Sequence, residues 1–170
     1  MTNYIFGLLL LTSSCGQLNN SHETDNWYED TKQLIVENAE SKPDSSMIFF
    51  GNQKFSVISY KNGLHIKQNN YCKNTTLCGE TLFGKDTTLE LRREIYPNGQ
   101  YAFEGIYYNG YFFGLSTWWY DNGQIRKQGF RFKNSKIGTW REFDKDGKVI
   151  AESDYNNLDK LDSLPNFHRK

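Results

Sequence analysis

One small turn motif recurs three times along the chain at a constant interval of 24 residues. Each copy joins Asn or Asp to Gly between apolar residues, as Trp119 and Ile125 flank Gly123. Such turns are strong hairpin signals, and a hairpin that recurs at a fixed period indicates a sheet extended unit by unit. The sequence therefore predicts a mainly β fold, an antiparallel repeat sheet of hairpins. We expect positive φ at the glycines of the turn residues Asn98, Gly99, Asn122, Gly123, Asp146 and Gly147.

A second glycine marks the same interval. Gly114 and Gly138 each precede a turn glycine by nine residues, and we expect a tight bend between units at both positions. Glu90 stands at the equivalent position of the first unit. The predicted repeats therefore cover residues 89–157 as two full units and one partial unit.

The composition suits one soluble domain and argues against nucleic acid as a partner. The 170 residues are 37% hydrophobic and 24% charged, and 20 basic residues balance 20 acidic ones. A chain without net charge lacks the basic field that attracts nucleic acid. Aromatic residues make up 16% of the chain, and 15 of the 27 lie between Tyr96 and Phe143, within the repeats.

The first 14 residues have the pattern of an export signal. Their apolar run from Tyr4 to Leu11 is too short to span a bilayer and suits the h-region of a signal peptide. The following LTSSC resembles the lipobox of bacterial lipoproteins, which implies a lipid on Cys15, an anchor in a membrane and a location in the bacterial cell envelope, on the periplasmic or outer-membrane side. No Lys or Arg precedes the run, and Thr12 stands where that box usually has Leu. A cleaved secretory peptide and a disordered cytoplasmic segment remain alternatives.

The segment between Cys15 and the sheet predicts a tether and one short helix. Residues 15–25 are polar and without periodicity, as in a flexible linker. Asn26 and Glu29 resemble a capping box, and Lys42-Pro43 ends the pattern, which predicts an amphipathic helix over 26–42. We expect its apolar stripe to dock on the sheet. The stripe comprises Trp27, Thr31, Leu34 and Ile35.

Strand patterns begin at Met47 and continue through the segment 43–88. Asn62-Gly63 lies between two of them and predicts a hairpin from Lys54 to Gln68 with a type I′ turn. The three histidines of the chain are scattered, so a metal site at the neighbouring cysteines lacks further ligands. In an exported protein Cys72 and Cys78 favour a disulfide over free thiols. Residues 158–170 are expected to form a tail.

The repeats resemble a known family. The stretches NGYFFGLSTWWYDNGQ (Asn109 to Gln124) and NSKIGTWREFDKDGK (Asn134 to Lys148) are similar to the MORN-repeat-variant proteins of the YwqK type, which are often labelled antitoxin-like. The resemblance covers about residues 89–157. It implies a repeat-sheet architecture and, through its label, a protein that neutralises a toxin by direct binding.

A single-layer sheet cannot bury both faces, so part of the aromatic set should stay exposed and form a candidate binding face. Trp118 and Trp119 must point to opposite faces if they share a strand. Ordinary cross-strand packing is the alternative for any one of these residues. The candidate face comprises Tyr108, Trp118, Trp119, Tyr120 and Trp140.

No catalytic motif for hydrolysis, nucleotide binding or metalloprotease chemistry occurs in the sequence. The run from Glu142 to Ser153 imitates a calcium loop, but Ser153 stands where a bidentate Glu is required. We therefore expect no catalytic residues, metal or cofactor. The leading hypothesis is a non-enzymatic, membrane-anchored binding module that presents its sheet to a protein or glycan partner. The alternatives are an antitoxin-like protein and a hydrolase whose residues are assembled by the fold.

Overall fold

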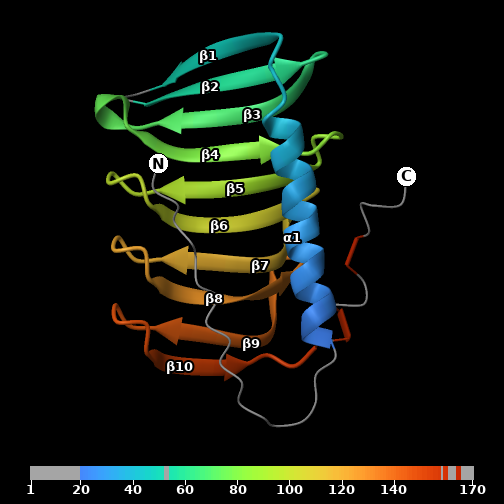
Figure 1. Ribbon diagram of the computed structural model, residues 1–170, viewed down its shortest axis with the longest axis vertical. Coiled ribbons are helices and arrows are strands. Elements are labelled where there is room, and N and C mark those ends of the chain that lie inside the picture. The colour runs from blue at the N-terminus through green and yellow to red at the C-terminus, as the bar shows by residue number, and fades with distance from the viewer. Residues whose placement is uncertain (1–19, 52–53, 158, 161–163, 166–170) are drawn as a thin grey trace, which may run out of the picture.

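Ten strands form one antiparallel sheet in the computed structural model, which describes residues 20–51, 54–157, 159–160 and 164–165 (Figure 1). Every strand pairs with its neighbour in sequence, so the order is β1 to β10 without a crossover. The predicted antiparallel sheet of hairpins is confirmed. The elements are α1 (Asn20–Ala39), β1 (Ser45–Gly51), β2 (Lys54–Lys61), β3 (Leu64–Tyr71), the 3₁₀ turn η1 (Lys73–Thr75), β4 (Leu77–Phe83), β5 (Leu89–Ile95), β6 (Tyr101–Tyr108), β7 (Tyr111–Trp119), β8 (Ile125–Phe132), β9 (Ser135–Phe143) and β10 (Val149–Asp154).

The repeated turns lie at one end of the strands and have a common geometry. Gly99, Gly123 and Gly147 have φ of 86°, 85° and 83°. In the central copy the Gly123 nitrogen donates to the Tyr120 carbonyl over 3.0 Å, and the Tyr120 nitrogen donates to the Gln124 carbonyl over 2.8 Å. This is a type I turn followed by a left-handed residue, a common three-residue hairpin loop in which glycine carries no steric penalty.

Two-residue loops close three of the hairpins at the other end of the strands, and the longer loop 84–88 closes the one between β4 and β5. Asn62-Gly63, Asn109-Gly110 and Lys133-Asn134 have positive φ at both positions, as a type I′ turn requires. The sheet therefore has two chemically different ends, one with three-residue loops and one with two-residue loops.

Side chains tie each three-residue loop to the next one along the sheet. The Tyr96 hydroxyl donates to the Trp119 carbonyl over 2.9 Å, and the equivalent Tyr120 hydroxyl donates to the Phe143 carbonyl over 2.8 Å. The Asn98 amide donates in the same way to the Asp121 carbonyl over 2.7 Å. Consecutive units are therefore connected by repeated contacts, so that the stability of one unit depends on its neighbours.

The helix is longer at its start and shorter at its end than predicted. It spans Asn20–Ala39 in place of 26–42, so it takes in part of the predicted tether, and Asn26 lies in its interior and does not cap it. Residues 15–19 lie outside the described residues. A helix held in place by a docked segment extends by one hydrogen bond per residue, without needing an apolar stripe. The helical spacing of apolar residues therefore predicted only the part of the helix that docks on the sheet.

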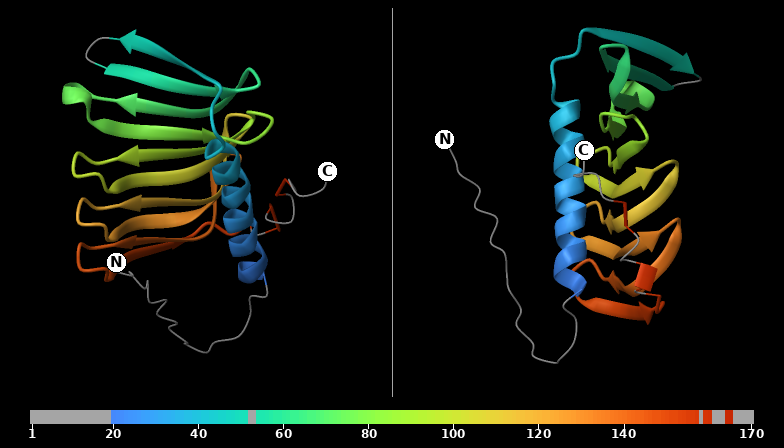
Figure 2. Two further views of the ribbon diagram at one scale, coloured as in Figure 1. Left: turned by 45° about the horizontal axis from the view of Figure 1, so that its top comes forward. Right: turned by 90° about the vertical axis from the view of Figure 1, so that its right-hand side faces the viewer.

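One face of the helix docks on one face of the sheet, close to the end with the two-residue loops (Figures 1 and 2). Its buried positions recur at helical spacing and contact a buried apolar cluster on β4, β5 and β6. Trp27 and Leu34, which were predicted in the stripe, are only half-buried. The buried set comprises Tyr28, Thr31, Ile35 and Ala39 on α1 and Leu82, Leu89, Leu91 and Ile106 on the sheet.

Gly114 and Gly138 are not bends between units, contrary to the prediction. Gly114 lies inside β7, where a register shift interrupts the pairing with β6, and has φ 71°. A Cβ atom there would lie 2.5 Å from Cζ3 of Trp27, so the missing side chain is what lets α1 approach. Gly138 lies inside β9, has φ 59° and also adjoins a register shift. The recurring glycine therefore marks a β-bulge in each unit.

Next to the apolar cluster, a series of hydrogen-bonded charged groups joins α1 to strands β4, β5 and β6. Glu104 accepts hydrogen bonds from Tyr28 (2.8 Å) and Lys32 (2.7 Å) on α1 and from Arg93 (2.7 Å) on β5. Arg93 also contacts Glu80 on β4 at 2.8 Å. Burial alone would raise the pKa of Glu104, but Lys32 and Arg93 outweigh it and lower that pKa. The pKa of Tyr28 is raised because burial and the Glu104 charge disfavour its ionised form.

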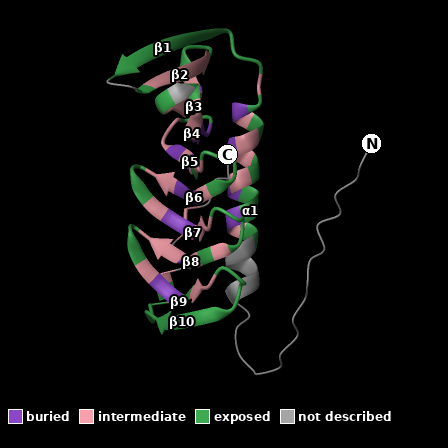
Figure 3. Ribbon diagram, turned by 90° about the vertical axis from the view of Figure 1, so that its left-hand side faces the viewer, coloured by how far each residue is buried: buried purple, intermediate pink, exposed green. Residues whose placement is uncertain are grey.

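The strands at the N-terminal end of the sheet lie beyond the reach of α1. Every residue of β1 is exposed, including Phe50, which keeps 83% of its accessible surface (Figure 3). Cys72 and Cys78 form a disulfide that closes the loop between β3 and β4. At the other terminus, the Pro165 carbonyl accepts a hydrogen bond from the Trp27 indole over 2.6 Å, so this part of the predicted tail contacts the helix.

Replacing Gly123 with Val should lower the free energy of unfolding by about 1 kcal/mol or more, because a β-branched residue is strained at φ 85°. The new Cβ would also lie 3.2 Å from Oε1 of Gln100 in the preceding turn. Gly147→Val should have a smaller effect, because that turn lies at the end of the sheet and has only one neighbouring unit.

Chemical denaturation of both variants tests this expectation. Gly51→Val is the matched control, since Gly51 has no positive φ and the nearest atom to its added Cβ is 3.8 Å away. Equal losses for Gly51→Val and Gly123→Val would contradict the role given to the turn.

Glu104→Gln should lower stability at pH 7 by about 3–5 kcal/mol, because it leaves Lys32 and Arg93 without their shared anion. The folded-state pKa of Glu104 is lowered from 4.5, so its stabilisation is complete above about pH 4.5 and is lost as the pH falls through the folded value. Between pH 7 and pH 3 the native protein should therefore lose more stability than the variant. Urea titrations at both values measure this, with Glu152→Gln in the exposed pair with Arg141 as the control. A variant with the same pH dependence as the native protein would refute the assignment.

Candidate binding face

Aromatic rings from three strands gather on the face of the sheet that α1 does not cover. We call this set the aromatic face: Phe103 and Tyr107 on β6, Phe112 and Trp118 on β7, and Trp140 on β9. The pairing of β6 with β7 places Phe103 opposite Trp118 and Tyr107 opposite Phe112. The ring centroids of Phe103 and Trp118 lie 4.8 Å apart, and those of Trp118 and Trp140 lie 5.9 Å apart. The rings therefore form a continuous series across the sheet.

Glycines form the floor on which two of these rings lie. A Cβ atom on Gly129 would lie 2.3 Å from Cδ2 of Trp140, and one on Gly105 would lie 2.7 Å from Cζ of Phe103. The two glycines are 24 residues apart, as the turn glycines are. Sequence reasoning missed this third glycine position, although its spacing was the available signal. The rings can lie against the backbone only because these positions lack side chains.

Cations stand over the ring faces. The Arg131 guanidinium lies 4.9 Å from the centroid of Phe112 and 5.1 Å from that of Trp140. Lys136 lies 4.7 Å from the Trp140 centroid, and Arg92 lies 4.0 Å from that of Tyr107. These distances fall within the range of cation–π attraction. Sequence reasoning found none of these cations, because their partners are set by the register between strands.

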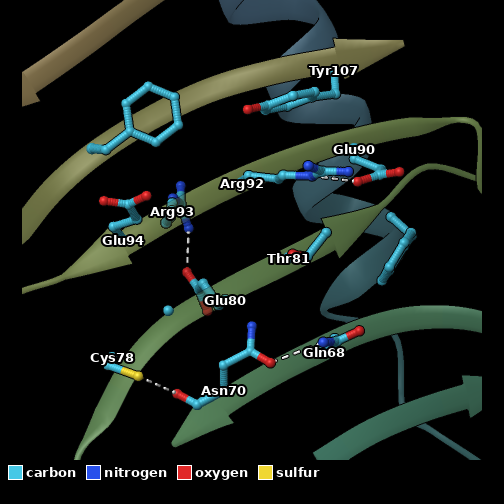
Figure 4. Close-up of a pocket in the computed structure, with 13 residues that line it drawn as sticks. Gln68, Asn70, Cys78, Glu80, Thr81, Glu90, Arg92, Arg93, Glu94 and Tyr107 are labelled. Atoms are coloured by element: carbon cyan, nitrogen blue, oxygen red, sulfur yellow. Dashed lines mark hydrogen bonds and ion pairs between the residues drawn. The ribbon is translucent and has the colours of Figure 1, made fainter. Parts of the chain in front are cut away.

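A polar groove of 580 Å³ continues the aromatic face toward β3 (Figure 4). Phe103 and Tyr107 border it, and in Figure 4 the helix lies behind the sheet. The Gln68 amide donates to Asn70 over 2.8 Å, and Arg92 contacts Glu90 at 2.7 Å, so the groove presents amide, guanidinium and carboxylate groups. Such a mixture can donate and accept hydrogen bonds along one ligand.

The electrostatics of the groove centre on Arg92. Burial disfavours its charge, but the hydrogen bond and charge of Glu90 outweigh that effect and raise the pKa of Arg92. Burial raises the pKa of Tyr107, and the neighbouring Arg92 opposes this rise. Tyr107 therefore stays a neutral hydroxyl, able to donate a hydrogen bond at physiological pH.

The five predicted face residues do not share one surface. Trp118 and Trp140 lie on the aromatic face, whereas Tyr108 packs beside the cluster under α1. Trp119 contacts Tyr101 (6.3 Å between centroids), beside the three-residue loops, and alternation places it on the face opposite Trp118. The Tyr120 hydroxyl donates to the Phe143 carbonyl, as one of the repeated hydrogen bonds between the three-residue loops. Cys15, the predicted lipidation site, lies outside the described residues.

No group of three or more His, Cys, Asp or Glu side chains in the described part of the chain is arranged to hold a metal ion. Within the same residues, no helix combines the length and the apolar character needed to cross a membrane.

Residues 114–134 and 136–157 match the family model of the MORN repeat variant. The two matched segments cover β8 and β10 in full and most of β7 and β9, so the resemblance seen in the sequence is confirmed for these repeats. No curated protein matches the chain.

Several solved structures show a weak likeness. A crystal structure of TarM is 9% identical over 71% of this chain and 21% of its own, with a TM-score of 0.31. A mutant TarM from S. aureus, in complex with Fondaparinux, alpha-GlcNAc-glycerol and UDP, is 7% identical over 74% and 24%, with a TM-score of 0.31. The accessory secretory protein 1, 2 and 3 structure from Streptococcus pneumoniae is 16% identical over 69% and 21%, with a TM-score of 0.25. The chain thus spans between about a fifth and a quarter of these proteins, and at such TM-scores the likeness carries no conclusion.

Proposed function

We propose that this protein is a non-enzymatic binding module that presents the aromatic face and the adjoining groove to a protein or glycan partner. The observation that carries the proposal is the position of Trp118: its ring stands in a continuous aromatic series on the face opposite α1 and is only half-buried. Tyr107 and Phe112 in the same series are also half-buried, whereas Phe103 and Trp140 are buried. Accessible apolar patches on protein surfaces mark interaction sites.

The physical character of the face supports this function. Its rings are held by close ring contacts and by glycine floors, so they lose little conformational freedom when a partner binds. Rigid aromatic side chains beside a polar rim are the features from which binding hot spots are built. A repeat sheet of MORN variant units is consistent with this role.

Adjacent tryptophans on opposite faces provide the test. The full chain is screened on a glycan array and a peptide array, and the bound probe is then titrated with variants. Trp118→Ala should weaken binding by about tenfold or more, as expected for an interface hot spot. Trp119→Ala, the matched control on the other face, should bind as the native protein does. A loss confined to Trp119→Ala, or binding to neither array, would contradict the proposal.

We further propose that the module is anchored in the bacterial cell envelope by a lipid on Cys15. The support is the apolar run followed by LTSSC at the start of the chain. Several acyl chains on one cysteine would give stable anchoring, whereas one chain gives only marginal binding.

Metabolic labelling with palmitate in a bacterial host separates this proposal from the antitoxin-like alternative. The native protein should carry label in the membrane fraction, and Cys15→Ala should carry none. An unlabelled native protein that stays in the cytoplasm would contradict the anchor and favour the alternative.

A further inference from the structure

Two cations face each other on the aromatic face without a shared anion. Arg131 on β8 and Lys136 on β9 are directly opposite in the pairing of the two strands. Both stand over the ring of Trp140, at 5.1 Å and 4.7 Å from its centroid. Like charges directly opposite one another across a sheet are destabilising. The arrangement therefore calls for a compensating group.

Within the described residues, neither cation has a carboxylate in ion-pair contact. Arg131 donates through Nη1 to the Asn134 carbonyl over 2.8 Å, and its buried Nε has no hydrogen-bond partner. Lys136 donates to the Tyr155 hydroxyl over 2.9 Å. A buried N–H without a partner is uncommon in proteins and requires an explanation.

Other cations on the same face differ from this pair. Arg92 is paired with Glu90, and Lys127 is paired with Glu142. Burial lowers the pKa of Arg131, and only Tyr107 opposes that effect. Lys127 is the main cause of the lowered pKa of Glu142, and the charge of Lys136 contributes less. The Arg131 and Lys136 pair therefore lacks an anion in direct contact, unlike the other cations of the face.

We propose that Arg131 and Lys136 form an oxyanion site that holds the carboxylate, sulfate or phosphate group of an acidic glycan bound on the aromatic face. Nε of Arg131 is enclosed, so an oxyanion at this site accepts from the other N–H groups of the guanidinium and from the Lys136 ammonium, and it offsets the repulsion between the two cations. The Trp140 ring beneath them is only 2% exposed, so it supports the two cations and does not contact a ligand. A sugar ring can lie instead against Trp118, which is half-buried and whose centroid is 5.7 Å from the Arg131 guanidinium. This inference rests on the proposed function, because it assigns a ligand class to the same face.

The position of the site in the sheet favours a glycan over an acidic peptide. Strands β8 and β9 have paired neighbours on both sides, so their backbone groups are occupied by the ladder and offer no edge to an added strand. A ligand here must bind through side chains alone. The amides of Gln68 and Asn70 and the hydroxyl of Thr81, in the adjoining groove, suit the hydroxyl groups of a sugar.

Sulfate tests the oxyanion site without requiring knowledge of the glycan. The melting temperature of the full chain is measured in sodium sulfate and in sodium chloride at equal ionic strength. Sulfate stabilises proteins generally by exclusion from their surface, so the readout is the difference between matched variants. Arg126 is an exposed arginine of the same strand, and Arg126→Gln removes the same charge as Arg131→Gln.

The native protein and Arg126→Gln should gain about 2–4 °C more from sulfate than Arg131→Gln does, because only the first two retain the site. Lys136→Gln should behave as Arg131→Gln does, with Lys133→Gln as its control. An equal sulfate effect in all five proteins would overturn the oxyanion site.

Three immobilised polymers then test the ligand class: polygalacturonate (an acidic glycan), dextran (a neutral one) and poly-glutamate (an acidic peptide). We expect binding to polygalacturonate that falls at least tenfold in Arg131→Gln and stays unchanged in Arg126→Gln. Binding to dextran alone, unaffected by Arg131→Gln but lost in Trp118→Ala, would overturn the oxyanion site and leave the proposed function standing. Arg131-dependent binding to poly-glutamate with none to polygalacturonate would overturn the glycan assignment.

Discussion

The contact between α1 and one face of the sheet decides what the opposite face can do. A single layer of strands has two faces, and this chain supplies one described helix to cover part of one of them. Ile35 is fully buried in that contact, and Glu104 ties the helix to the sheet through Tyr28 and Lys32. The helix side therefore carries the apolar cluster and its charged network. The other side carries two buried rings, Phe103 and Trp140, together with half-buried rings and cations, and it is the face that we propose for binding.

The repeat makes the uncovered face regular. Every unit contributes a three-residue loop at one end, and the two full units add a β-bulge glycine, Gly114 or Gly138. In β6 and β8 a further glycine, Gly105 or Gly129, lets an aromatic ring lie against the backbone. The hydroxyls of Tyr96 and Tyr120 each donate to a carbonyl next to the following loop, and these bonds fix the spacing between consecutive loops. Since each unit is positioned by the one before it, rings from β6, β7 and β9 meet in one series without a closed core beneath them. The aromatic face is rigid because the tyrosine hydrogen bonds hold the loops together and because its rings lie against the backbone at glycines.

The parts of the fold that depend on local chemistry could be predicted from the sequence. Asn122-Gly123 can form few structures other than a tight turn, and the 24-residue interval extends this conclusion to the whole sheet. The start of α1 could not be predicted, because its first turns are polar on all sides and gain their helical state by propagation from the docked segment. The sequence showed that Gly114 recurs at the repeat interval, but not why a glycine is needed there. The structure gives the reason: Trp27, 87 positions away in the sequence, packs against it.

Which residues form the aromatic face depends on the register between strands. These residues were therefore the hardest part of the structure to predict from the sequence. Alternation alone separates Trp118 from Trp119, yet it cannot say which rings or cations stand opposite each of them. A bulge shifts the pairing of β9 with β8, so Arg131 reaches Trp140 and Lys136 only in the folded sheet. The MIFF run of β1 illustrates the converse: a continuous apolar run is typical of a buried strand, but these side chains lie beyond the end of the helix and remain exposed.

The central claim is that ligands bind on the face opposite α1, and the four tryptophans of the chain report on it directly. Trp118 and Trp140 lie on the aromatic face, Trp27 lies between α1 and the sheet, and Trp119 lies beside the three-residue loops. The decisive measurement is an NMR titration of the four indole N–H resonances of the full chain with polygalacturonate. The resonances of Trp118 and Trp140 should move, while those of Trp27 and Trp119 should stay in place. Movement confined to Trp119 or Trp27, or no movement at Trp118 and Trp140, would contradict the account.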